Sequence, residues 1–210
     1  MRLKSPGFEN NRPLPKIYAF GAPDPVNHVR LTENRNPAFN WYGVPDATRS
    51  LVMLCHDPDV PSKPDDVNQE DREVPANLPR VDFYHWVLVD LSAVATGIGE
   101  GVYSDGVTAR GKEGPQGPNG TRQGLNNYTE WFAGDADMEG RYFGYDGPCP
   151  PWNDSIVHHY VFTLYAIDIE KCPLEGVFGG AEVRDAICPH VLAQASLTGL
   201  YSLNPKVRIN

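Results

Sequence analysis

The stretch that decides the fold covers residues 146–160 and reads DGPCPPWNDSIVHHY. Pro148, Pro150 and Pro151 fall close together in its first half. Proline fixes φ near about −65° and has no backbone N–H, so this half predicts a stiff loop, here called the rim. The second half leads into an apolar segment that predicts a strand over residues 157–168. The chain therefore places a rigid rim directly before a buried strand, which is one way to build a small pocket.

Alternation along this strand separates its titratable side chains. Successive side chains of a strand point to opposite faces of the sheet. His158 and Tyr160 should therefore share one face with Phe162, while His159 should point the other way. We expect His158 and Tyr160 to face the pocket and His159 to lie in packing or at the surface.

A second buried strand precedes an acidic corner. Residues 51–56 read LVMLCH, a continuous apolar run typical of a strand buried on both faces. The run continues into Asp57-Pro58-Asp59-Val60-Pro61, where proline is expected to end the ladder. The following segment, residues 62–79, is polar and rich in proline, which predicts a long loop.

The next strand carries a histidine. Residues 83–91 read FYHWVLVDL, and a period of two puts His85 on the face of Phe83, Val87 and Val89. The last regular element is predicted as a helix over residues 181–196, with a kink at Pro189.

Composition favours one loop-rich β domain. The chain has 210 residues, of which glycine and proline contribute 20 each, and this share favours short strands over a helical bundle. We expect an N-terminal surface arm over residues 1–16 and a single domain over residues 17–210. The formal net charge is −9 and no basic stripe occurs, so nucleic acid is not an expected partner.

Targeting and redox signals indicate a cytoplasmic protein. The first residues lack the apolar run of a secretory signal, and no segment reaches the roughly 20 apolar residues of a membrane span. The cysteines include no C-x-x-C pair, so we expect buried free thiols and neither disulfides nor zinc ligands. They are Cys55, Cys149, Cys172 and Cys188.

Taken in their order along the chain, the motifs in these strands and in the rim resemble those of the phosphatidylethanolamine-binding protein family, which includes the Raf kinase inhibitor proteins. The resemblance runs over residues 17–200, and its style is closest to the bacterial and archaeal branch. The matching segments are NWYGVP at 40–45, DPDVP at 57–61, HWVLV at 85–89, residues 147–160, FTLYAID at 162–168 and ASLTG at 195–199.

The resemblance implies a mainly β, two-sheet antiparallel fold with long loops and a short C-terminal helical segment. It also implies a non-enzymatic binding protein with a small anion pocket, which takes a phosphate-bearing or carboxylate ligand and needs no cofactor. Kinase or protease targets and a homodimer are the protein partners that it suggests. The ligand-binding positions carried over from the family motifs are Asp57, Pro58, Asp59, His85, Gly147, Pro150, Pro151, His158 and Tyr160.

Histidine and tyrosine can donate to an anion, and we expect glycine-rich backbone near Gly147 to add N–H donors. A carboxylate at Asp57 should repel an anion, so we interpret it as a group that orients a histidine and raises its basicity.

The sequence departs from the family pattern in the rim and in two longer segments. Trp152-Asn153-Asp154-Ser155 stands where relatives commonly carry a lysine-like residue and glycine, and this change is expected to alter the mouth of the pocket. Residues 62–80 and 104–145 are expanded, and their role stays open.

A metal-dependent hydrolase is the alternative reading, with Asp57, His85 and His158 as zinc ligands. A serine hydrolase is disfavoured because no G-x-S-x-G elbow occurs. A reactive thiolate at Cys149 also stays open, although a small residue that fits the turn is the simpler reading.

Overall fold

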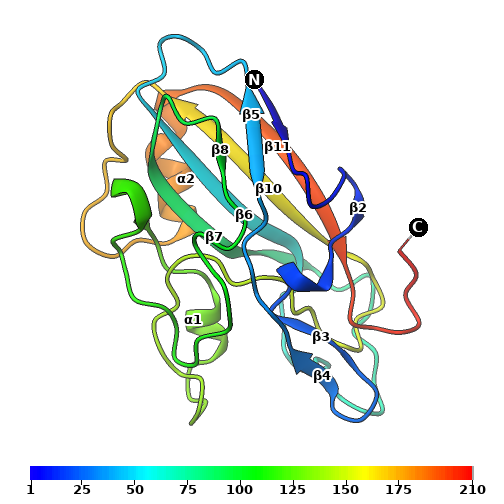
Figure 1. The fold of residues 1–210 in the computed structure, drawn as a ribbon. Coiled ribbons are helices and arrows are strands. Elements are labelled where there is room, and N and C mark those ends of the chain that lie inside the picture. Colours follow the sequence, from blue (N-terminus) through cyan, green and yellow to red (C-terminus); the bar gives the residue numbers. More distant parts are fainter. Residues whose placement is uncertain (210) are drawn as a thin grey trace.

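The computed structural model describes residues 1–209 (Figure 1). Its main element is a six-stranded sheet, antiparallel except where its edge strand β2 lies parallel to β11. In sheet order its strands are β2 (Arg12–Pro13), β11 (Val191–Tyr201), β10 (His158–Ile167), β6 (Ser50–Pro61), β7 (Arg80–Ser92) and β9 (Arg122–Gln123).

Smaller elements complete the fold. The second sheet contains β1 (Arg2–Lys4), β5 (Phe39–Tyr42) and β8 (Gly97–Ile98), and β3 (Gly21–Asp24) pairs with β4 (His28–Leu31) in a hairpin. The helices are α1 (Tyr128–Trp131), α2 (Gly180–Ile187) and three 3-10 turns, Lys16–Tyr18, Pro118–Gly120 and Cys188–His190. The predicted mainly β class is confirmed, and the hairpin adds a small third sheet.

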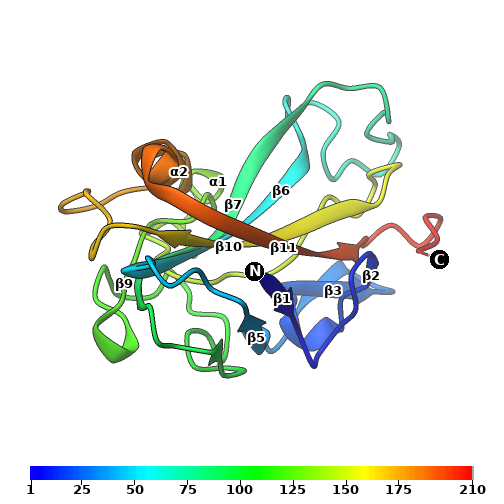
Figure 2. The same ribbon diagram turned by 90° about the horizontal axis from the view of Figure 1, so that it is seen from above.

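The six-stranded sheet is buried on both faces, as the apolar run in β6 predicts. Leu51 and Met53 pack into one hydrophobic core, while Val52 and Leu54 pack into a second core on the opposite face. Figure 2 shows α2 over one side of β10 and β11, with β1 and β5 on the other side. The pocket described below forms at one end of this layered arrangement.

The first 16 residues are more than the predicted surface arm. β1 pairs with β5, and Leu3, Phe8 and Leu14 are buried in the same core as Trp41. Their apolar side chains cover the sheet face opposite α2, so the prediction of an arm is corrected at these three positions.

The predicted helix over residues 181–196 ends at Ile187. A 3-10 turn containing Pro189 follows, and the chain then continues as β11, which pairs with β10 along its length. The second half of that prediction is therefore wrong. Pairing with an open strand edge outweighs the weak helical periodicity of this segment.

The acidic corner also differs from the prediction, because the ladder does not end at Pro58. β6 continues to Pro61, and a register shift between Asp57 and Val60 takes Pro58 out of regular pairing. Proline inside a sheet is confined to edges and bulges, and here the bulge accommodates it.

The four cysteines are free thiols. Cys55 and Cys172 are buried as expected, Cys149 is partly buried, and Cys188 is exposed, which corrects the prediction for Cys188. No helix within residues 1–209 has the length and apolar character needed to cross a membrane.

Candidate functional site

A cavity of about 190 Å³ opens where β6, β7 and β10 meet the rim. Its most buried polar side chains are those of Asp57, His85 and Tyr160, which are 1%, 3% and 1% exposed; we call these three residues the floor. The remaining lining residues are Val60, Pro61, Pro64, Val67, Phe83, Tyr128, Trp131, Cys149, Pro150 and Pro151.

Five predicted site residues line this cavity and four do not. Those that line it are Asp57, His85, Pro150, Pro151 and Tyr160. Those that do not are Pro58, Asp59, Gly147 and His158. Alternation in β10 places His158 and Tyr160 toward the interior and His159 toward solvent, as predicted. His158 nevertheless reaches the cavity only through its hydrogen bond to Asp57.

A β-bulge directs His85 into the cavity. Cys55 pairs with Trp86 and His56 pairs with Tyr84, so His85 has no residue opposite it in β6. His85 lies against Tyr160 on the pocket side, and Val87 and Val89 belong to the core on the other face. The predicted face is therefore wrong for Val87 and Val89, while Phe83 lies beside His85 as predicted. A bulge inserts one residue and reverses the alternation, a common way to aim a side chain at a site.

The hydrogen bonds of His85 determine its tautomer. Nδ1 lies 2.7 Å from the carbonyl oxygen of Asp146, which can only accept, so Nδ1 carries the proton. Burial lowers the pKa of His85 despite the nearby Asp57, which keeps the free imidazole neutral. Nε2 then presents a lone pair, and it has no hydrogen-bond partner among the described residues.

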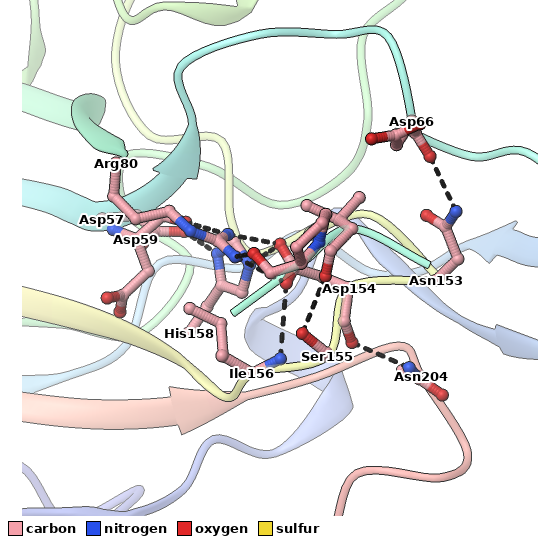
Figure 3. A network of polar contacts seen from close by, with 12 residues as sticks. Asp57, Asp59, Asp66, Arg80, Asn153, Asp154, Ser155, Ile156, His158 and Asn204 are labelled. Carbon is pink, nitrogen blue, oxygen red and sulfur yellow. Dashed lines mark hydrogen bonds and ion pairs between the residues drawn. The ribbon is translucent and has the colours of Figure 1, made fainter. Parts of the chain in front are cut away.

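A chain of alternating charges lies beneath the floor (Figure 3). Asp57 Oδ2 accepts from His158 Nδ1 at 2.6 Å, and Asp154 Oδ2 accepts from His158 Nε2 at 3.0 Å. Arg80 binds both carboxylate oxygens of Asp154, at 2.6 and 3.1 Å. Burial alone would lower the pKa of His158, but the two carboxylates raise it to about 9. The histidine is therefore an imidazolium at neutral pH, as expected for a histidine paired with Asp57, but it does not line the cavity, so the charge lies beneath the floor and not in the pocket.

Sequence reasoning missed Arg80 and the role of Asp154. Asp154 is almost fully buried, and His158 and Arg80 hold its pKa below the usual range despite the cost of burial. Arg80 comes from 74 residues earlier in the chain. The sequence signal for this contact was the four-residue spacing from Asp154, in the unusual rim segment, to His158.

Two further lining residues come from α1, which lies in the expanded segment 104–145. Tyr128 donates to the carbonyl oxygen of Gly147 at 2.8 Å, and Trp131 lies at the mouth. The aromatic spacing of Tyr128, Trp131 and Phe132 was a helical signal that sequence reasoning left unused.

Hydroxyl and thiol groups in the pocket stay protonated at neutral pH. Burial and the carboxylate of Asp57 raise the pKa of Tyr160 well above its ordinary value. Burial raises the pKa of Cys149 to about 12, so its thiol is not an activated nucleophile. The thiolate reading of Cys149 therefore has no support in this geometry.

Asp146 holds the start of the rim. Its Oδ1 accepts from Asn34 Nδ2 at 2.7 Å and from Lys112 Nζ at 2.6 Å, and its Oδ2 accepts from Asn126 Nδ2 at 2.8 Å. Lys112 and Asn126 belong to the expanded segment 104–145, so this buried carboxylate fastens that segment to the pocket.

Asn153 holds the end of the rim against the β6–β7 loop, residues 62–79. Its Nδ2 lies 2.8 Å, 3.2 Å and 3.1 Å from the carbonyl oxygens of Asp66, Gln69 and Arg72. Its Oδ1 accepts from the backbone N–H of Asn68 at 2.9 Å. The unusual rim sequence and the expanded loop are therefore parts of one structure.

Two predicted positions have other tasks. Asp59 Oδ2 accepts from the backbone N–H and the ring of His159, at 2.9 and 2.8 Å. The Gly147 N–H donates to Asn34 Oδ1 at 2.8 Å, so it is not the free donor that we expected. A Cβ at Gly147 would lie 1.9 Å from the Tyr18 carbonyl oxygen, which explains the glycine.

The proposed zinc ligands do not converge. Both ring nitrogens of His158 already bind carboxylates, so this side chain has none left for an ion. Within residues 1–209, no group of three or more His, Cys, Asp or Glu side chains is arranged to hold a metal. The geometry therefore does not support the metal-dependent hydrolase built from Asp57, His85 and His158.

Comparison with known proteins agrees with this architecture. The family model described as phosphatidylethanolamine-binding protein matches residues 4–202. A UPF0098 protein of Methanothermobacter thermautotrophicus is 31% identical over 96% of this chain and 98% of its own length. The UPF0098 protein YbhB of Escherichia coli is 29% identical over 81% of this chain and 83% of its own.

A solved structure also resembles this fold. It is described as a phosphatidylethanolamine-binding protein homologue from Chlamydia trachomatis, and it superposes with a TM-score of 0.64 at 27% identity over 96% of both chains. The resemblance found in the motifs, including its bacterial and archaeal style, is therefore confirmed. The chain belongs to the phosphatidylethanolamine-binding protein family.

Proposed function

We propose that this protein is a non-enzymatic binding protein whose pocket holds the anionic head of a small phosphate-bearing or carboxylate ligand. Family membership is consistent with a binding protein. The observation that carries the proposal is the Nε2 atom of His85, which belongs to a buried side chain on the floor and has no partner within the described residues.

The charge on Asp57 does not prevent this role, because the imidazolium of His158 neutralises it at 2.6 Å. His85 is neutral in the free protein, since burial lowers its pKa. An anion beside Nε2 favours the protonated ring. Binding of a fully ionised anion therefore takes up a proton at His85, and affinity rises as the pH falls.

Titration with inorganic phosphate, followed by the NMR shifts of the histidine rings and by calorimetry in two buffers of different ionisation enthalpy, tests the proposal. We expect shifts at His85 and an uptake of protons. His85→Ala and Asp57→Ala should each weaken binding by about tenfold or more, because a charge-assisted hydrogen bond and its supporting charge are lost.

His190→Ala is the matched control, because His190 pairs with Asp168 and neither residue lines the cavity. It should leave phosphate affinity unchanged. An absence of any response at His85 in the wild-type protein, whose fold is not in question, would refute the anion pocket.

The remaining expectations from the resemblance stay predictions. They are the modulation of a kinase or protease, a homodimer and a cytoplasmic location. Pull-down with the purified protein and measurement of its mass in solution test the first two directly.

A further inference from the structure

The cavity changes character from its floor to its mouth. The polar groups of Asp57, His85 and Tyr160 lie in almost fully buried side chains. Toward solvent the lining is apolar, with Pro64 exposed and Trp131 46% exposed. Of the described lining residues, none is a lysine or arginine that would hold a second anionic group.

The walls suit a flat ring. Phe83, Tyr128 and Trp131 present aromatic surfaces, and Pro150 and Pro151 supply rigid apolar ones from the rim. Aromatic rings pack favourably edge to face or offset, with centroids about 4.5–7 Å apart. A ligand with a polar or charged tail would lose hydration against these walls without gaining a hydrogen bond.

The size of the cavity limits the ligand further. Its volume of about 190 Å³ is below the roughly 300–1,000 Å³ typical of sites for drug-sized molecules. One compact ring attached to an anionic head is therefore a better match than a long chain or a multi-ring body.

The walls are also fixed in place, so they can discriminate between ligands. Pro64 and Val67 belong to the β6–β7 loop, which Asn153 holds through its side-chain amide. Tyr128 is tied to the rim through the Gly147 carbonyl oxygen. A wall held on both sides needs little reordering when a ligand enters, and preorganisation of this kind favours affinity.

We propose that this pocket recognises small aromatic anions, that is, aryl phosphates or aryl carboxylates, with the anionic head on the floor and the ring between the rim and α1. The inference rests on the proposed function, because the head occupies the same anion position at His85. Trp131 is the specificity-determining residue, since it forms the apolar wall at the mouth.

Calorimetric titration with four probes tests the inference: inorganic phosphate, phenyl phosphate, phosphoethanolamine and benzoate. Phenyl phosphate should bind at least about tenfold more tightly than inorganic phosphate, because the ring buries its apolar surface against the walls of the cavity. Phosphoethanolamine should gain no such advantage, and benzoate should compete with phenyl phosphate.

Trp131→Ala identifies the wall responsible. It should reduce the affinity for phenyl phosphate by about fivefold or more and leave inorganic phosphate unchanged. Tyr42→Ala is the matched control, since Tyr42 is an exposed aromatic residue of β5 that does not line this cavity and should change neither affinity.

The outcomes separate the two proposals. Equal affinity for phosphate and phenyl phosphate would overturn the aromatic preference and leave the anion pocket intact. Tighter binding of phosphoethanolamine than of phenyl phosphate would also overturn it. Failure of all four probes to bind would remove the anion pocket itself.

Discussion

The charge of His158 links the pocket to the stability of the fold. Asp57 and Asp154 raise its pKa to about 9 in the folded protein, whereas the pKa of a histidine in an unfolded chain is about 6.5. The stabilisation is therefore fully present below the unfolded pKa and is lost as the pH rises through the folded pKa. The difference corresponds to about 3 kcal/mol at most.

We therefore predict that the free energy of unfolding falls by about 2–3 kcal/mol between about pH 6 and pH 9.5. Urea denaturation at both pH values measures it. His158→Gln should lower stability at pH 6 and flatten the pH dependence, while His190→Gln should keep it. A wild-type protein equally stable at both values would contradict the charged state of His158.

Sequence reasoning at this scale succeeded where regular alternation holds. The opposite orientations of His158 and His159 follow from the period of a strand, and β10 is regular at that point. His85 could not be assigned to a face in this way, because a bulge depends on how two strands pair. Arg80 was missed because nothing local shows that it reaches Asp154.

At the scale of elements, the rim is a loop whose two ends are held by hydrogen bonds from polar side chains. Asp146 holds the segment 104–145 at one end, and Asn153 holds the β6–β7 loop at the other. The sequence showed two expanded loops and an unusual rim as separate features. Only the fold shows that the rim provides the hydrogen bonds that both loops need.

Asn153→Ala should release the β6–β7 loop. The carbonyl oxygens of Asp66, Gln69 and Arg72 would lose a shared donor, at a cost of about 1–3 kcal/mol in the free energy of unfolding. Hydrogen exchange should accelerate across residues 62–79.

Gln69→Ala is the control within the same loop, because the Gln69 side chain is exposed and makes one long hydrogen bond of 3.4 Å. It should leave exchange and stability unchanged. Unaltered exchange in Asn153→Ala would show that the loop is held by other contacts.

The C-terminal segment shows where periodicity misleads. Apolar residues at 183, 187 and 191 fit a helix, and α2 does include the first two. Beyond the turn at Pro189, the edge of β10 offers a full ladder of hydrogen bonds to residues 191–201. Such long-range pairing has no signature in a short window of sequence.

At the scale of the whole molecule, the sheet is stable because both faces are covered. α2 covers one face, and residues from the first 16 cover part of the other. The β class and the family could be predicted from glycine and proline content and from motif order. The contribution of the N-terminus could not, because three apolar residues among polar ones show no period.

Phe8→Ala should therefore destabilise the protein by about 3–5 kcal/mol, as for other buried aromatic residues. Phe8 packs against Phe39 and Phe162 with ring centroids 6.2 and 5.7 Å away. Thermal denaturation measures the loss. Lys4→Ala, at an exposed position of β1, should change little, and an equally small effect of Phe8→Ala would restore the picture of a surface arm.

The hydrogen bonds at both ends of the rim limit how its neighbouring loops can be exchanged between related proteins. Three carbonyl groups of the β6–β7 loop share the side-chain amide of residue 153 as their donor, so we expect the conformation of this loop to depend on the rim sequence. We therefore expect the β6–β7 loop and the rim sequence to be exchangeable only together. A graft of residues 62–79 onto a relative should hold its conformation only when Trp152-Asn153-Asp154 is transferred with it.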